Sequence, residues 1–244
     1  MTNHRWNTKA YEDRVELLKR TELYKLYPSE AWCLYRLIPE CETVVDLGCG
    51  DGAKAEICRK IKPSISYTGM DHQERLVAKA QEALPFARFE SADMLEYLLR
   101  RHQYDLVMSW SVVKSFANWR DVISGMLGLA RKYVVFDLRI SNTDAEIFDN
   151  TYSWAEYGGI KNPILIVNYE RVFSYLKSLP NVGRIEVAGY QSVTDPHARC
   201  INPSLEMFVL TFVIFVRETN EDSQEIEIYE QLPKNLLCEG GRPA

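Results

Sequence analysis

Residues 43–52, which read Thr-Val-Val-Asp-Leu-Gly-Cys-Gly-Asp-Gly, combine the features of a turn that binds a cofactor. The β-branched run at residues 43–45 is typical of a buried parallel strand. Gly48, Gly50 and Gly52 then allow a sharp turn in which the backbone approaches a ligand closely. The sequence therefore predicts a strand that ends at a cofactor.

The spacing and the charge of this turn indicate the class of cofactor. Dinucleotide-binding turns carry Gly-x-Gly-x-x-Gly and hold a pyrophosphate at a helix N-terminus, whereas these glycines are spaced Gly-x-Gly-x-Gly. Asp46 precedes the turn and Asp51 lies within it, so two carboxylates would repel a pyrophosphate. They favour a ligand that carries an ammonium and a sulfonium and no phosphate, and S-adenosylmethionine is such a ligand.

At this turn the sequence resembles the class I S-adenosylmethionine-dependent methyltransferases. Their motif Asp/Glu-x-Gly-x-Gly-x-Gly is matched by Asp46, Gly48, Gly50 and Gly52. The resemblance implies S-adenosylmethionine as cofactor and an antiparallel hairpin at the C-terminal end of a mostly parallel, seven-stranded sheet. The alternative is a glycine turn in some other α/β domain.

The rest of the chain alternates between strand and helix patterns with short connections. Such alternation predicts an α/β fold in which a doubly wound parallel sheet is covered on both faces. Helices are expected at residues 53–61, 73–84, 95–101, 118–130 and 169–179, and strands at residues 65–70, 86–90, 133–138, 184–190 and 205–216, with a fourth strand starting at Tyr104.

Five further residues are expected to bind the cofactor. Asp71 lies about twenty residues beyond the glycines, where an acid at the end of a strand accepts hydrogen bonds from ribose hydroxyls; its alternative role is a helix cap. The resemblance assigns Asp93 and Met94 to the adenine, although Asp93 also suits a helix N-terminus. It places Ser109 and Trp110 in the loop that passes the sulfonium.

The expected domain covers residues 1–217 and contains two segments outside its core of strands and helices. Residues 1–40 form a helical leader, with Ser29 as a cap, and in the family such a segment lies over the cofactor. The connection at residues 140–167 is long, and long connections in compact domains are usually lids or binding loops. We expect it to shape the acceptor pocket.

The catalytic groups are less well defined, because Lys114-Ser115 stands near the place where related small-molecule methyltransferases often carry Glu-His. His197 is a candidate general base on the loop between the last two strands. The alternative is an ordinary histidine of a surface loop. Asp137 and Arg139 are alternatives that orient or bind the acceptor. The aromatic residues Tyr152, Trp154 and Tyr157 suit a wall that stacks on a sugar or a planar ring, against simple packing of the lid.

Composition narrows the class of protein. The chain has 244 residues, 46% of them hydrophobic, and a net charge of −5, with seven acidic and three basic residues between Arg217 and Ala244. The remainder is nearly neutral, which disfavours a nucleic-acid binder. No signal peptide and no membrane span are evident, and the six cysteines are expected to be free thiols, so a cytoplasmic location follows.

A second resemblance bears on the methyl acceptor. A weak resemblance to methyltransferases of bacterial surface-polysaccharide gene clusters, carried by residues after the fifth strand, points to O-methylation of a saccharide hydroxyl. One alternative is a domain that binds S-adenosylmethionine or S-adenosylhomocysteine without turnover, as a regulator or scaffold. A nicotinamide-dependent oxidoreductase is disfavoured by the glycine spacing. The acidic tail at residues 218–244 contains an alternating stretch that suits an edge strand or a homodimer contact.

Overall fold

A computed structural model of the chain describes residues 9–17, 19–144, 146–157, 159–191, 198–200, 207–217 and 226–232. The chain divides into two compact units. The first comprises Met1–Trp110 and Gly125–Val135, and the second comprises Ser111–Ser124 and Phe136–Ala244. Helix α6 (Trp119–Leu129) and strand β5 (Ala130–Ser141) pass from one unit into the other.

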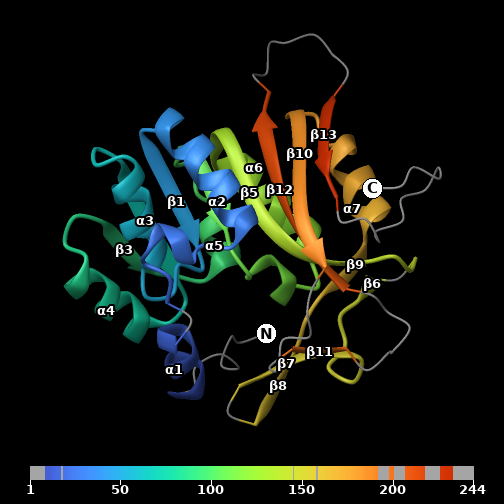
Figure 1. Ribbon diagram of the computed structural model, residues 1–244, viewed down its shortest axis with the longest axis horizontal. Coiled ribbons are helices and arrows are strands. Elements are labelled where there is room, and N and C mark those ends of the chain that lie inside the picture. Colours follow the sequence, from blue (N-terminus) through green and yellow to red (C-terminus); the bar gives the residue numbers. More distant parts are fainter. Residues whose placement is uncertain are drawn as a thin grey trace. The chain divides into compact units, whose positions relative to one another are not determined.

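The first unit contains the leader helices and the first four strands (Figure 1). Its helices are α1 (Lys9–Leu17), η2 (Leu23–Lys25), α2 (Pro28–Leu37), η3 (Ile38–Glu40), α3 (Ala53–Ile61), α4 (Glu74–Ala83) and α5 (Met94–Leu98). Its strands are β1 (Thr43–Leu47), β2 (Ser66–Asp71), β3 (Arg88–Ser91) and β4 (Tyr104–Ser109). Val44, Val45, Leu106 and Val107 are fully buried, as the hydrophobic runs predict for central parallel strands.

The order of these strands identifies the edge at which a ligand binds. The order is β4-β1-β2-β3, and β1 pairs in parallel with both β2 and β4. The chain thus continues to one side of β1 and then crosses to the other side. In doubly wound sheets ligands bind at such a reversal, beyond the carboxyl ends of the strands.

The second unit contains a hairpin and a small separate sheet. Its elements are η4 (Val113–Ser115), β6 (Glu146–Ile147), β7 (Ser153–Tyr157), β8 (Ile160–Pro163), β9 (Ile166–Asn168), α7 (Tyr169–Ser178), β10 (Val182–Gln191), β11 (Ala198–Cys200), β12 (Met207–Val216) and β13 (Glu227–Gln231). Strands β10 and β12 are antiparallel, as expected, and β13 lies beside β10 at the edge (Figure 1). The rings of Phe136 and Phe212 stack with centroids 5.2 Å apart in the core of this unit.

The predicted α/β fold with a mostly parallel sheet is confirmed, and the main sheet is larger than expected. In the second unit, β6 pairs with β9 and β13 pairs with β10, so the described residues contain three strands of the main sheet beyond the seven predicted ones. The long connection after β5 is not a plain loop. It forms β7 and β8, which make a three-stranded antiparallel sheet with β11 at the bottom of Figure 1.

One predicted cap is wrong. Ser29 lies inside α2, and the N-cap is Tyr27, followed by Pro28 at the first helical position. The Tyr27 N–H donates to the Glu30 carboxylate at 3.0 Å, so the side chain three residues on satisfies the start of the helix.

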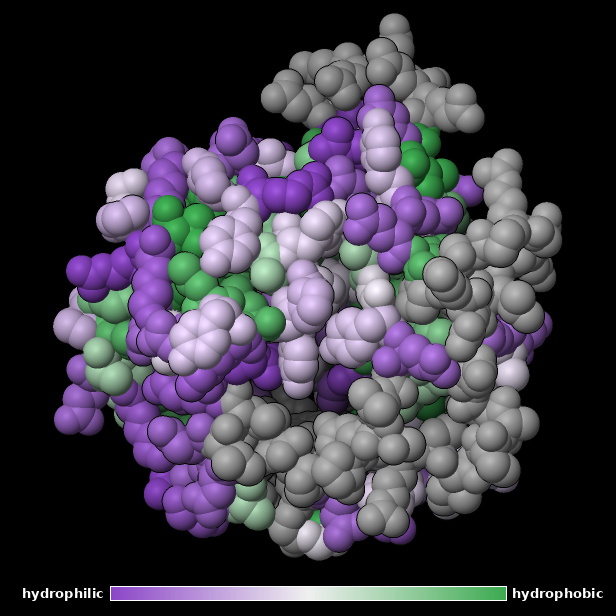
Figure 2. All heavy atoms as spheres, in the orientation of Figure 1, coloured by the Kyte–Doolittle hydropathy of each residue, from purple (hydrophilic) through white to green (hydrophobic). Residues whose placement is uncertain are grey.

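Hydrophilic residues cover much of the described surface on the face drawn in Figure 2, with smaller apolar areas between them. Among the described helices, none combines the length and the apolar character that crossing a membrane requires.

Candidate functional site

The glycine loop, which carries Gly48, Gly50 and Gly52, joins β1 to α3 in a conformation that depends on glycine. The three residues have φ angles of 82°, 57° and 79°, a region that other residues rarely adopt. The Gly48 N–H donates to the carbonyl of Met70 at 2.7 Å, and the Gly50 N–H donates to the Asp71 carboxylate at 2.9 Å. The loop is therefore fixed to the end of β2.

Gly52 also lacks room for a side chain. A Cβ atom there would lie 2.7 Å from the Phe89 ring and 2.9 Å from Leu84. Backbone conformation and close packing thus require glycine at position 52, the N-cap of α3.

Asp71 ends β2 and is 4% exposed. One carboxylate oxygen accepts from Gly50, and the other accepts the Gln73 N–H at 2.9 Å. The N-cap of α4 is Gln73, so the helix-cap alternative for Asp71 does not hold. Oδ1, which accepts from Gln73, also lies 3.3 Å from His72 Nδ1, whereas Oδ2, which accepts from Gly50, has a second lone pair that can accept from a ribose hydroxyl.

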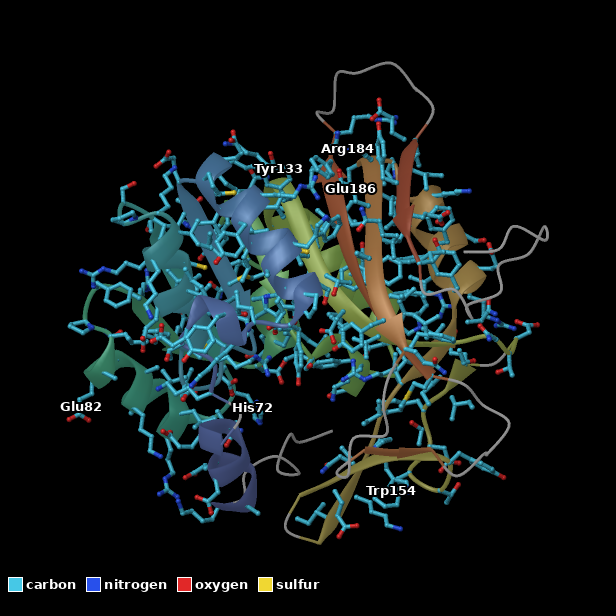
Figure 3. The ribbon with its side chains drawn as sticks, in the orientation of Figure 1. His72, Glu82, Tyr133, Trp154, Arg184 and Glu186 are labelled. Carbon is cyan, nitrogen blue, oxygen red and sulfur yellow. The ribbon has the colours of Figure 1, made fainter. Side chains whose placement is uncertain are left out.

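Several buried polar atoms near this end of the sheet lack a partner. Among the described residues, neither amide atom of Gln73 is hydrogen-bonded, nor are His72 Nε2 and Trp110 Nε1. Gln73 is 1% exposed, and His72 lies beside the start of α4 (Figure 3). A buried polar group without a partner costs about 1–3 kcal/mol, so these atoms fit a polar ligand with hydroxyl, amino and ring-nitrogen groups.

Asp46 is buried beneath the loop. Its carboxylate accepts a hydrogen bond from the Tyr67 hydroxyl at 2.6 Å. Burial raises the pKa of Asp46 to about 6, against the opposing effect of the Tyr67 bond. A positive charge above this carboxylate would favour its ionised form.

Asp93 lies at a helix N-terminus, which was the alternative to adenine contact. It is the N-cap of α5, and its carboxylate accepts from the N–H groups of Leu95 at 2.8 Å and Glu96 at 3.3 Å. Met94 is the first residue of α5 and is buried. Contact of Asp93 and Met94 with adenine stays a prediction.

Ser109 ends β4 and Trp110 follows it, and their side chains make different contacts. The Ser109 hydroxyl is fully buried and donates to the Leu47 carbonyl at 2.9 Å, so it joins the ends of β1 and β4. The Lys54 ammonium lies 5.8 Å from the centroid of the Trp110 ring. Trp110 Nε1 has no hydrogen-bond partner among the described residues, which leaves its N–H for a ligand.

An ionic group that the sequence did not indicate lies beside the loop. Glu30 accepts from Lys54 Nζ at 2.9 Å and from Arg20 at 2.8 Å. Burial raises the pKa of Glu30, but the two cations outweigh this effect and hold it below its usual value. The pairing joins residues 10 and 24 positions apart, and no local pattern predicts contacts over such separations. The one available signal was a Lys two positions after the last glycine of the motif.

The second unit brings Asp137 and Arg139 together with Ser111. The Ser111 N–H and the Arg139 guanidinium each donate to a different oxygen of Asp137, the latter at 3.1 Å. Ser111 has a φ of 59°, an uncommon conformation outside glycine that this bond stabilises. Because both Asp137 oxygens are engaged, Asp137 suits an orienting role better than that of a free base.

The expected aromatic residues differ in their surroundings. Tyr152 is 56% exposed, whereas Trp154 is 7% exposed and lies on the small sheet, with Lys161 Nζ 4.2 Å from its ring (Figure 3). Tyr157 ends β7, and its side chain lies outside the described part of the structure. A stacking wall of all three stays a prediction.

His197 lies outside the described residues. The next residue, Ala198, begins β11 and is paired in register with Ala155 of β7. The segment after His197 therefore lies beside the predicted lid. Elsewhere in the described chain, His, Cys, Asp and Glu side chains form no group of three that could hold a metal ion.

Comparison with known families and proteins adds evidence for residues 44–134. A family described as "Methyltransferase domain" matches residues 44–134, which begin in β1 and end in β5. A trans-aconitate 2-methyltransferase of Variovorax paradoxus is 32% identical over 102 residues, or 42% of this chain. The match spans 37% of the length of that relative.

Solved structures support the same fold over more of the chain. The N-terminal domain of EvdMO1, crystallised in the presence of S-adenosylhomocysteine and D-fucose, has a TM-score of 0.59 at 13% identity and covers 89% of this chain and 98% of its own. An O-methyltransferase of a Brevibacillus brevis polyketide synthase, in complex with S-adenosylhomocysteine, has a TM-score of 0.52 at 14% identity and covers 78% and 62%.

Proposed function

We propose that the chain transfers the methyl group of S-adenosylmethionine to a small-molecule acceptor, because residues 44–134 match the family described as "Methyltransferase domain". The observation that carries the proposal is the glycine loop bonded to Asp71 at the reversal of strand order. This arrangement gives a ligand without phosphate a close backbone approach and a charged acceptor for its ribose.

The chain's residues would act chiefly by binding and alignment. The bound cofactor supplies an electrophilic methyl group on a sulfonium. Asp71 would hold the ribose, the glycine loop would admit the methionyl group, and ionised Asp46 would favour the cationic end electrostatically. In-line displacement gains up to roughly 7–11 kcal/mol from ideal positioning, so a general base is needed only for weakly nucleophilic acceptors.

For the acceptor we propose a saccharide hydroxyl. Support comes from the weak resemblance to polysaccharide-cluster methyltransferases and from the EvdMO1 domain, which was crystallised with D-fucose. Asp137 and Arg139 offer a paired, nearly neutral set of polar groups, which suits a neutral acceptor.

A carboxylate is the second candidate acceptor, because the curated relatives are trans-aconitate 2-methyltransferases. A carboxylate is ionised at neutral pH and needs no base. At saturating S-adenosylmethionine, activity with trans-aconitate would therefore be flat above about pH 6, whereas a hydroxyl acceptor served by a histidine gains activity as the imidazole loses its proton near pH 6.5.

Transfer of labelled methyl from S-adenosylmethionine to D-fucose, other 6-deoxyhexoses and trans-aconitate tests both acceptors. Labelling of a sugar, with none of trans-aconitate, supports the hydroxyl proposal. Labelling of trans-aconitate alone would replace it with carboxyl methylation. Cofactor binding without transfer to any of these acceptors would favour the regulatory or scaffold alternative.

A further inference from the structure

Two cations converge on one carboxylate oxygen beside the glycine loop. Lys54 Nζ lies 2.9 Å and an Arg20 nitrogen 2.8 Å from Oε1 of Glu30, whereas Oε2 of Glu30 accepts the Tyr27 N–H at 3.0 Å. We call Arg20, Glu30 and Lys54 the Glu30 cluster. All three side chains are largely buried, with exposed fractions of 22%, 6% and 11%.

The cluster carries an excess of one positive charge and unused donors. Lys54 has three N–H donors, and the structure gives it one hydrogen bond. Arg20 Nε is buried without a partner among the described residues, although guanidinium donors seek oxygen acceptors. An additional anion would satisfy both requirements.

The position of Lys54 places this positive charge at the cofactor loop. Lys54 is the second residue of α3, two positions after Gly52, so its side chain starts at the positive end of that helix. Its ammonium also lies 5.8 Å from the centroid of the Trp110 ring, in the loop that follows β4.

The neighbouring charged groups leave one moiety of the cofactor without a partner. Asp46 and Asp51 suit the cationic groups of S-adenosylmethionine. Lys19 Nζ lies 3.1 Å from the Asp51 carboxylate, so the positive charge of Lys19 is already balanced by Asp51. The methionyl carboxylate is the cofactor's anionic group, and the Glu30 cluster is the buried cationic group beside the loop.

We propose that Lys54 and Arg20 bind the methionyl carboxylate of the cofactor and that Glu30 positions both cations. This inference rests on the proposed cofactor. It assigns the leader a direct part in binding, because Arg20 and Glu30 precede the family-matched residues. The competing explanation is a purely structural ion pair that joins α2 to α3.

Two ligands that differ by the carboxylate separate these explanations. Calorimetry would compare S-adenosylhomocysteine with its decarboxylated analogue, S-adenosyl-3-thiopropylamine, on the full chain and on Lys54→Met and Arg20→Met. Comparing two ligands on one variant cancels general losses of folding. Lys60→Met is the matched control, since Lys60 lies on the same helix and pairs with Glu22 at 2.9 Å, away from the loop.

We expect Lys54→Met and Arg20→Met to weaken S-adenosylhomocysteine by about tenfold or more, as for a lost charge-assisted hydrogen bond, and the decarboxylated analogue by less than about threefold. Lys54→Arg should retain most of the affinity, and Lys60→Met should change neither ligand.

Equal weakening of both ligands, or no change in either, would overturn the inference and leave a structural ion pair. A wild-type chain that binds neither ligand would instead overturn the proposed function, and the inference with it.

Discussion

Asp71 connects the glycine loop to the expected ribose site through a single side chain. Replacing it with alanine removes the charged acceptor for the ribose hydroxyls and frees the Gly50 N–H. We expect the affinity for S-adenosylmethionine to fall by about tenfold or more, since hydrogen bonds to charged groups contribute about 1.5–3 kcal/mol. Isothermal calorimetry on a variant that keeps its circular dichroism spectrum measures this; unchanged affinity would remove Asp71 from the site.

The raised pKa of Asp46 makes cofactor binding depend on pH. The folded carboxyl, with a pKa of about 6, is protonated below that pH, whereas an unfolded Asp has its usual pKa of 3.8. Its contribution to folding stability is thus greatest at low pH and is lost as pH rises through about 6. Binding of a cationic cofactor has the opposite sign, because the ionised carboxylate attracts it.

We therefore expect the affinity for S-adenosylmethionine to fall as pH drops from 7 to 5, and Asp46→Asn to lack this step. Tyr67→Phe should move the midpoint to higher pH, because it removes the bond that favours the ionised form. Titrations at several pH values check both variants. A wild-type affinity that is flat across this range would contradict the assignment.

His197 decides how the reaction proceeds with a hydroxyl acceptor. If it is the base, His197→Ala lowers turnover by about a hundredfold or more and leaves cofactor affinity within about twofold. Steady-state kinetics with a labelled sugar acceptor, alongside calorimetry, separates the two quantities. Near-normal turnover would show that His197 is an ordinary surface histidine.

At the scale of elements, the start of α3 depends on glycine. Gly52→Ala would place a methyl group at positive φ and against Phe89, so we expect a loss of at least about 1–2 kcal/mol in the free energy of unfolding. Gly128→Ala is the matched control. It lies in α6 with no atom within 4 Å of the added Cβ, and alanine there should stabilise by about 0.5–1 kcal/mol. Urea unfolding of both variants tests the contrast, and equal effects would contradict it.

Local patterns predicted the first unit well. Helix α3 begins at Ala53 and ends at Ile61 as expected, because a glycine turn precedes it and its buried residues recur at helical spacing. In the second unit, Asn168 lies directly before the helix predicted at residues 169–179, and its side chain caps α7 by accepting the Arg171 N–H.

Local patterns could not predict contacts between segments that are distant in the sequence. Strand β7 reads as an irregular aromatic stretch, and it becomes a strand only through pairing with β8 and with β11, more than forty residues away. The Glu30 cluster was missed for the same reason. Asp93 was ambiguous because one carboxylate at a helix start serves equally as a cap or a ligand contact.

At the scale of the whole molecule, the family match and the acceptor groups lie in different parts of the chain. The match ends at residue 134, whereas Asp137, Arg139 and the small sheet come later. The match to the methyltransferase family is therefore confined to residues 44–134, and the acceptor is a proposal that depends on the C-terminal part.

Thermal unfolding in the presence of S-adenosylhomocysteine or NAD, at equal concentrations, tests the central claim most directly. A ligand at a hundred times its Kd stabilises the folded chain by about 2.7 kcal/mol, which raises Tm by about 5 °C or more for a chain of this size. The account predicts such a rise with S-adenosylhomocysteine and none with NAD. Stabilisation by NAD alone would contradict it.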